Sequence, residues 1–315
     1  MNKYFLGPFL AFLIMLINPV LNSHPAFCKD RLENIVRTAA VAGKFYPDSP
    51  DVLKGAITEL LTNVPATKPD GRILAAIAPH AGYVFSGPVA ACTHRQLSEV
   101  SFDTIVIIGH DSYRDVVAFT SPADYFETPL GRVQVDREMT EAMEKYNPGI
   151  RPDQSLHETE HTVEVQLPFL QVQGRQFKIV PILFGNPNAK NSSILADAIV
   201  ACRADKKVFV LASTDMSHYP PYDWANKLDK STLDALKEVD AERLFSHLTS
   251  KETLSPVPNL ATAMCARGGV MTAINYARAN GGNHCQILRY ANSGDVPSGG
   301  KDRVVGYCSV LFEKK

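Results

Sequence analysis

The sequence predicts a single three-layer α/β domain built on a central sheet that is mainly parallel or mixed. Apolar segments of strand length alternate with longer segments in which apolar residues recur at helical spacing. Three of the apolar segments, 72–78, 104–109 and 208–212, lead directly into polar residues. The carboxyl ends of strands form the ligand-binding edge of an open α/β sheet, so we expect these polar residues to share one site.

Composition places the chain among ordinary globular proteins. Of its 315 residues, 45% are hydrophobic and 21% are charged, which is enough apolar material for a sizeable core. The net charge of −1 offers no electrostatic basis for binding nucleic acid. Residues 30–315 contain no linker-like stretch, so we expect them to form one domain.

The first 28 residues differ from the rest. Lys3 precedes a nearly uncharged apolar run, Tyr4 to Leu21, and smaller residues follow as far as Cys28. This order is typical of a signal peptide, and the run is also about as long as a minimal membrane span. We therefore expect residues 1–28 to be a signal peptide or membrane anchor, and the protein to be exported, periplasmic or membrane-anchored. Any membrane contact would be made through this segment only.

The spacing of apolar residues, together with residues typical of helix and strand ends, predicts the following helices and strands. Ser49-Pro50-Asp51 is typical of a helix start, and the apolar spacing after it predicts a helix over 52–61. Strand 177–185 contains Pro181, which predicts an edge strand or a bulge. The same criteria predict further helices at 87–100, 136–146, 160–172, 192–203, 224–248 (with room for a break) and 260–280, and late strands at 285–290 and 303–312.

Two histidine-containing turns follow predicted strands. His80 comes after Ala78-Pro79 and before Gly82, and His110 comes after strand 104–109. The simpler alternative for His80 is that it satisfies loop backbone groups. Their shared position at strand ends favours a role in a site, because imidazole serves both acid–base chemistry and metal binding.

The segment after strand 208–212 contains Asp215 and His218, three residues apart. On a helical turn the two side chains would share a face, and the carboxylate could orient the imidazole and raise its basicity. The alternative is that Asp215 caps a helix and His218 lies on the surface.

Residues 157–161 spell His-Glu-x-x-His, the pattern of zinc peptidases in which Glu158 would be the general base. That chemistry needs one continuous helix, whereas the residues before His157 are loop-like and Pro168 follows closely. The favoured interpretation is that His161 and Glu164 open a helix whose first turn points into a site.

Cys265 lies in a stretch rich in small residues, followed by Arg267, Gly268 and Gly269. A lone cysteine in such a stretch is commonly part of the core. The nearby cation and the glycine pair favour instead a thiolate at a local opening. The residues alone leave both interpretations open. The other cysteines after Cys28 form no CxxC pair and no disulfide framework.

Taken together, these segments resemble the Memo family, also called AmmeMemoRadiSam system protein B. The resemblance covers nearly the whole chain after the leader. It is carried by Ala39–Pro47, Ala78–Tyr83 with Ser86-Gly87 and Ala90-Ala91, Glu160–Phe169, Val180–Leu183 with Gly185, Ser213–His218, and Cys265.

The resemblance implies a fold similar to class III extradiol dioxygenases and a metal, iron or copper, held by two histidines and one cysteine. The first histidine matches His80 and the cysteine matches Cys265. After the next strand the family has Gly-Pro-Ser-His, where this chain has Gly109-His110-Asp111-Ser112. Ser112 therefore takes the place of the second ligand, unless His110 reaches the metal from two residues earlier.

The resemblance also places Asp215, His218 and His161 in the same pocket, as acid–base or supporting groups. It implies a metal-dependent redox or dioxygenase-like function. The alternative is a non-enzymatic protein that uses the pocket to capture a peptide, a small molecule or a metal.

Overall fold

The computed structural model describes residues 34–315 apart from Ala66 and Ser255. The predicted leader, residues 1–28, lies outside the described residues. Among the helices in the described part of the chain, none is both long and apolar enough to cross a membrane.

An eight-stranded mixed sheet forms the centre of the domain. In spatial order its strands are β10 (His284–Asn292), β11 (Gly306–Lys314), β2 (Arg72–Ala78), β9 (Val208–Ser213), β3 (Thr104–Asp111), β8 (Lys178–Phe184), β4 (Ala118–Thr120) and β7 (Ile150–Pro152). The four strands in the middle, β2, β9, β3 and β8, are parallel to one another. A smaller sheet contains β1 (Val36–Arg37), β5 (Tyr125–Thr128) and β6 (Gly131–Gln134).

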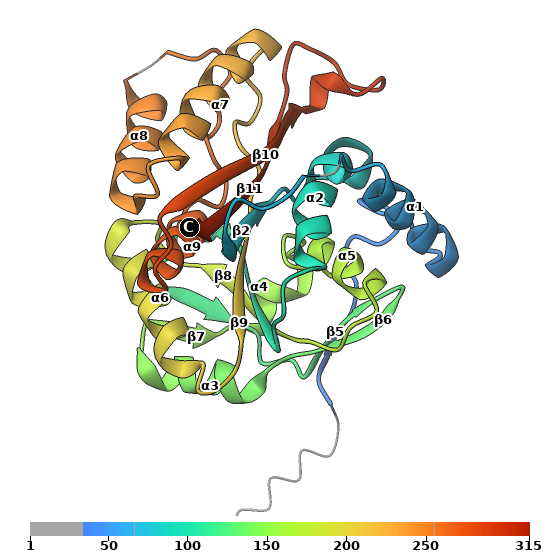
Figure 1. Ribbon diagram of the computed structural model, residues 1–315, viewed down its shortest axis with the longest axis vertical. Coiled ribbons are helices and arrows are strands. Elements are labelled where there is room, and N and C mark those ends of the chain that lie inside the picture. Colours follow the sequence, from blue (N-terminus) through green and yellow to red (C-terminus); the bar gives the residue numbers. More distant parts are fainter. Residues whose placement is uncertain (1–33, 66, 255) are drawn as a thin grey trace, which may run out of the picture. The chain divides into compact units, whose positions relative to one another are not determined.

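Helices cover both faces of the large sheet (Figure 1), which confirms the predicted single α/β domain with three layers. One face carries α3 (Arg137–Tyr146), α6 (Ala189–Cys202), α7 (Tyr222–Leu236), α8 (Ala241–Thr253) and α9 (Arg267–Ala279). The other face carries α1 (Pro50–Thr62), α2 (Tyr83–Leu97) and α5 (Leu167–Val172). Short helical turns complete the chain: α4 (Gln154–Thr159), η1 (Glu164–Gln166) and η2 (Ser293–Asp295).

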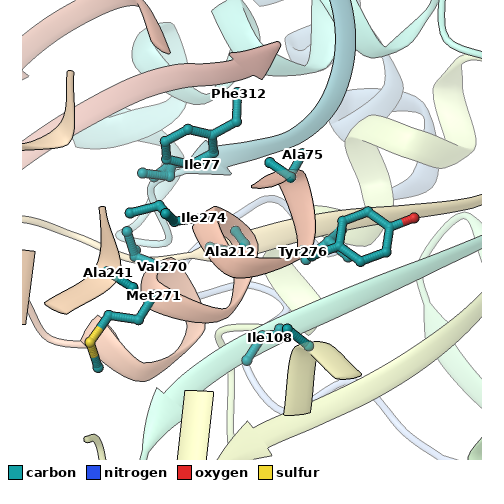
Figure 2. Close-up of a cluster of buried hydrophobic side chains, with 14 of the residues drawn as sticks. Ala75, Ile77, Ile108, Ala212, Ala241, Val270, Met271, Ile274, Tyr276 and Phe312 are labelled. Carbon is teal, nitrogen blue, oxygen red and sulfur yellow. The ribbon is translucent and has the colours of Figure 1, made fainter. Parts of the chain in front are cut away.

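Because helices cover both faces of the large sheet, the central strands are apolar along their whole length. Along β3, Ile105 and Ile107 join the core on one side, while Val106 and Ile108 join the core on the other. Figure 2 shows the second of these cores, where the α9 side chains, such as Ile274, pack against strand residues. α9 is thereby held against the strands whose ends build the site.

The proline in β8 does not mark a sheet edge, so that alternative of the prediction is wrong. The pairing with β3 is regular at Pro181 and shifts register only between Gly109 and Asp111, so the bulge alternative does not hold at the proline either. β8 lies inside the sheet, between β3 and β4. The ladder with β4 begins only at Ile182, and the bridge to Val135 is formed at Ile179. On the side of β8 away from β3, Pro181 falls between the bridge to Val135 and the ladder with β4. Its missing N–H therefore removes no ladder hydrogen bond on that side.

Two predicted helices begin later than expected. The segment predicted as helix 260–280 is helical only from Arg267, and Cys265 lies just before the helix. The predicted helix 160–172 is a turn of 3-10 helix from Glu164 followed by α5. The predicted helix 224–248 breaks between α7 and α8.

Candidate metal centre

His80 and Asp215 meet because two parallel strands end side by side. Ala78, the last residue of β2, pairs with Ser213, the last residue of β9. Two residues beyond each strand end, the His80 backbone N–H donates to Oδ1 of Asp215 at 2.8 Å. The structure thus places both residues at the carboxyl edge of the sheet, as the strand ends predict.

Cys265 reaches this edge on a segment that runs antiparallel to residues 214–218. His218 and Thr262 form a β-bridge, and the Cys265 N–H points to the Asp215 carbonyl. The Cys265 Sγ lies 3.2 Å from Nε2 of His80 and accepts the Asp215 backbone N–H at 3.3 Å. The thiol therefore faces the imidazole and is not an inert member of the apolar core.

His110 reaches the same place through a β-bulge. The pairing of β3 with β8 runs from Gly109–Leu183 directly to Asp111–Phe184, so His110 is the extra residue. Its backbone N–H donates to Oγ1 of Thr162 at 3.2 Å. Gly109 is required beside the bulge, because a Cβ there would lie 1.8 Å from that same oxygen. A bulge changes the direction of a side chain. This explains how His110 can reach the cluster although it lies two residues before Ser112, which occupies the family's ligand position.

His80, His110 and Cys265 form one cluster of metal-capable donors. One donor atom from each residue lies within 4.8 Å of the other two. His80 and Cys265 are buried, whereas the His110 side chain is 41% exposed. The cluster therefore has a buried floor and one histidine that solvent can reach. His110 therefore joins His80 and Cys265 in one group of donors, although it precedes the position that Ser112 occupies.

A directed hydrogen-bond network presents Nε2 of His80 to the cluster. The Ser213 hydroxyl donates to the Thr162 carbonyl at 2.7 Å and accepts from Nε2 of Gln166 at 2.8 Å. Its remaining lone pair faces Nδ1 of His80 at 3.3 Å, so Nδ1 carries the proton. Nε2 then presents a lone pair beside Cys265, which is the arrangement that metal-binding histidines need. No sequence pattern indicates that Ser213 and Gln166 position His80.

Asp215 supports His80 and does not orient His218, contrary to the prediction. Its Oδ2 lies 3.9 Å from Nε2 of His80. Burial raises the pKa of Asp215 to about 7, although backbone N–H groups of His80 and Ala81 oppose this shift. The chain at 214–218 stays extended and His218 bridges to Thr262 and Val305, so the shared helical face never forms.

His218 and His161 flank the cluster. Within the described residues, Nε2 of His218 has no hydrogen-bond partner, and burial followed by the charge of nearby His110 lowers its pKa to about 4. The His161 ring lies 5.4 Å from the His80 ring and 5.7 Å from the His110 ring. Burial is also the main cause of the lowered pKa of His161. The structure therefore brings all six predicted residues to one place.

Glu160 is a further residue of the site, and no sequence motif predicts its role. Its Oε2 accepts both the backbone N–H and the hydroxyl of Thr162, at 2.8 and 2.7 Å. Its buried Oε1 lies 3.5 Å from Nδ1 of His161 and 4.0 Å from Nδ1 of His110. The carboxylate thus holds the bulge-supporting threonine and faces two of the imidazoles. Nothing in the sequence separates Glu160 from the other acidic residues around it.

The His-Glu-x-x-His segment does not form a zinc-peptidase helix. α4 ends at Thr159, so its two histidines do not share a helix face. His157 is buried, with Nε2 3.3 Å from the Phe119 carbonyl, while His161 lies in the site. Glu164 was expected to point into the site with His161, and this expectation is wrong. Its carboxylate is buried against the Arg37 guanidinium and the Tyr46 hydroxyl.

The electrostatics of the cluster suit a bound cation. Burial, together with His110, His161 and His218, lowers the pKa of His80, which therefore stays neutral and able to donate its lone pair. Burial also raises the pKa of the Cys265 thiol, and Asp215 adds to this shift. A cation would offset the raised pKa of the thiol, because it stabilises the thiolate and the nearby carboxylate, and it would also keep His80 neutral. The donors present therefore fit a transition metal.

Comparison with known proteins identifies relatives along nearly the whole described chain. A family model described as Memo-like protein matches residues 37–311. A MEMO1 family protein of Archaeoglobus fulgidus is 36% identical over 281 residues, covering 88% of this chain and 99% of the relative. MEMO1 family proteins of Methanopyrus kandleri and Sulfolobus acidocaldarius are 35% and 36% identical, with the same 88% of this chain covered and 99% of each relative.

A solved structure shares the fold. The crystal structure of uncharacterized protein JW3007 from Escherichia coli K12 superposes with a TM-score of 0.51 at 12% sequence identity. The match covers 76% of this chain and 99% of that one. At such low identity the likeness extends to the arrangement of the sheet and helices alone.

Proposed function

The chain belongs to the Memo family, and we propose that its His80, His110 and Cys265 side chains bind a redox-active transition metal, iron or copper. The single observation that carries this proposal is the convergence of the three donors within 4.8 Å at the carboxyl edge of the sheet. Nothing in simple packing requires two imidazoles and a thiol from three distant segments to converge there.

The chemistry of the donors supports iron or copper over the alkaline-earth ions. Magnesium and calcium select oxygen ligands, whereas imidazole nitrogen and thiolate sulfur favour softer transition metals. When bound, such a metal would supply an electron-transfer centre that also polarises a coordinated ligand. A redox or dioxygenase-like function is the reaction class that this donor set suits best.

The surrounding residues would perform distinct tasks. Ser213 holds the proton of His80 on Nδ1, so that Nε2 faces the metal position. Asp215 can hold or release a proton near neutral pH, because its pKa is raised to about 7. His161 is 25% exposed and faces both His80 and His110, so it is placed to contact a ligand that enters from solvent.

Metal analysis of the purified protein tests the proposal. The chain would be purified without added metal, and its metal content measured by plasma mass spectrometry. It would then be loaded anaerobically with ferrous or cuprous ions and analysed again. The proposal expects iron or copper to be retained after gel filtration. Exposure of the loaded protein to air should then oxidise the metal and produce a thiolate-to-metal absorption band that is absent from Cys265→Ala. Absence of both metals after loading would refute it. Metal binding without turnover of any tested substrate would favour the non-enzymatic alternative.

A further inference from the structure

A second group of metal-capable side chains lies at the opposite end of the sheet. Asp70, His284 and Glu313 each offer one donor atom, and these atoms lie within 4.8 Å of one another. Nε2 of His284 lies 3.0 Å from Oδ2 of Asp70 and 3.9 Å from Oε2 of Glu313. The imidazole therefore stands between two carboxylates.

The strand order explains why these three residues meet. His284 opens β10 and pairs directly with Glu313 of β11. β11 in turn pairs with β2, and Asp70 lies two residues before β2 begins. The three side chains thus come from β10, β11 and the segment just before β2, at the sheet end where β2 starts. The His80 cluster lies beyond the other end of β2, so the two groups are separate.

Glu313 supplies the observation that sets this group apart from an ordinary surface cluster. The residue is fully buried, at 0% exposure. Its Oε1 accepts a long hydrogen bond, 3.4 Å, from the backbone N–H of Gly71, and the backbone N–H of Asp70 also interacts with the carboxylate. Its Oε2, which faces His284, has no hydrogen-bond partner in the described part of the chain. A buried carboxylate oxygen without a partner is costly, and a cation is the most direct way to satisfy it.

We propose that Asp70, His284 and Glu313 bind a divalent transition metal ion of the zinc type, which fastens the ends of β10, β11 and β2 together. One imidazole and two carboxylates form a nitrogen–oxygen donor set that zinc accepts and that has no soft sulfur to select copper. His284 would then carry its proton on Nδ1 and present Nε2 to the ion. The ion would stabilise the folded state, because the unfolded chain does not hold the three donors together.

Lys315 is the natural competitor for this position. Its Nζ lies 3.4 Å from the same Asp70 oxygen that His284 contacts. Lys315 is 47% exposed and has a long flexible side chain, so it can move aside when the ion binds. Removing its charge should therefore strengthen binding, whereas removing any of the three donors should weaken it.

Zinc titration of the full-length chain tests this proposal. The background is the His80→Ala, Cys265→Ala double variant, so that the first cluster cannot contribute. In this background we expect calorimetry to detect binding of a zinc ion, and the melting temperature to rise with zinc concentration. His284→Ala and Glu313→Gln should each weaken binding by at least about tenfold, the loss that removal of a ligand's supporting partner already produces. Lys315→Ala should tighten it.

The control is Asp302→Asn, which removes an exposed carboxylate outside the group and should leave zinc binding unchanged. His284 is half-buried at the surface, so its variant remains informative if the Glu313 variant does not fold. The proposal is overturned if the background protein binds no zinc, or if His284→Ala binds zinc as tightly as its parent. Neither result depends on whether the His80 cluster holds iron or copper.

Discussion

The Sγ of Cys265 lies 3.2 Å from Nε2 of His80, although 185 positions of sequence separate the two residues. The contact exists because the segment before α9 runs beside the extended residues that follow β9. The β9 end itself is fixed next to His80 by the pairing of Ala78 with Ser213. Two independent pieces of backbone thus hold the thiol against the imidazole, which is why we treat them as a ligand pair.

The first prediction concerns this pair. His80→Ala and Cys265→Ala should each remove most of the bound iron or copper and weaken metal affinity by at least about tenfold, because a site with three donors loses one of them. Metal content after loading and gel filtration measures the effect. Cys202→Ala is the matched control, because Cys202 is a free thiol in α6 away from the site. Wild-type metal content in both His80→Ala and Cys265→Ala would contradict the proposal.

The second prediction separates His110 from Ser112. Because the bulge in β3 brings His110 into the cluster, His110→Ala should lower metal affinity as strongly as His80→Ala. Ser112→Ala should have little effect. The comparison is made by competition with a chelator of known affinity. If Ser112→His strengthened binding while His110→Ala changed nothing, the bulge would be a structural feature only.

Much of this site follows from strand ends. The sequence places His80, His110 and Asp215 after three apolar strands, and parallel strands end at one sheet edge, so their convergence is predictable. The bulge at His110 is not, because it depends on the approach of Thr162 to Gly109 from a distant segment. Cys265 could be placed only through the family resemblance, since the helix expected to contain it begins two residues later.

The incorrect pairing of Asp215 with His218 has a similar origin. Spacing of three residues suggests a shared face only if the segment is helical. Here the bridges from His218 to Thr262 and Val305 keep the chain extended. These partners lie far along the sequence, so the residues around Asp215 and His218 cannot predict the two bridges. The contact of Glu164 with Arg37 is unpredictable for the same reason, because the two residues are 127 positions apart.

The third prediction concerns Asp215. Asp215→Asn should leave a saturated metal site largely occupied, because the carboxylate is not one of the three clustered donors, although its Oδ2 lies 3.9 Å from Nε2 of His80. Metal affinity of the wild type should rise with pH through about 7, as Asp215 ionises beside the cation. The variant should lack that part of the pH dependence. Affinity titrations of both proteins between pH 6 and 8 measure the difference, and parallel pH profiles would exclude this role of Asp215.

The fourth prediction concerns residues 1–28. The apolar run from Tyr4 to Leu21 after Lys3 leads us to expect translocation across a membrane, with or without cleavage. A reporter enzyme fused after Asp30 should appear outside the cytoplasm. The matched control replaces Leu13 and Leu16 with arginine, which interrupts the apolar run and should retain the reporter in the cytoplasm. Equal cytoplasmic retention of both fusions would contradict the prediction.

The last prediction concerns Asp229, a fully buried carboxylate in α7. It accepts hydrogen bonds from the Ser217 backbone N–H at 3.1 Å, the Ser217 hydroxyl at 3.0 Å and the Tyr290 hydroxyl at 2.8 Å. Burial nevertheless raises the pKa of Asp229 to about 7, from 3.8 for an exposed aspartate. The folded protein therefore binds a proton here that the unfolded chain releases near pH 4.

The sign of the pH effect on stability follows directly. Between about pH 4 and pH 7 the folded state holds the proton more tightly than the unfolded state, so the Asp229 contribution to the free energy of unfolding falls as pH rises. The slope is at most about 1.4 kcal/mol per pH unit for one proton. Asp229→Asn has no such proton, so its stability relative to the wild type should increase across this window. Urea unfolding at several pH values measures the difference.

Tyr290→Phe removes one hydrogen bond to the carboxylate, so it should extend the fall in the free energy of unfolding to higher pH. If the pH profiles of the wild type and both variants run parallel, Asp229 is ionised in the folded state throughout.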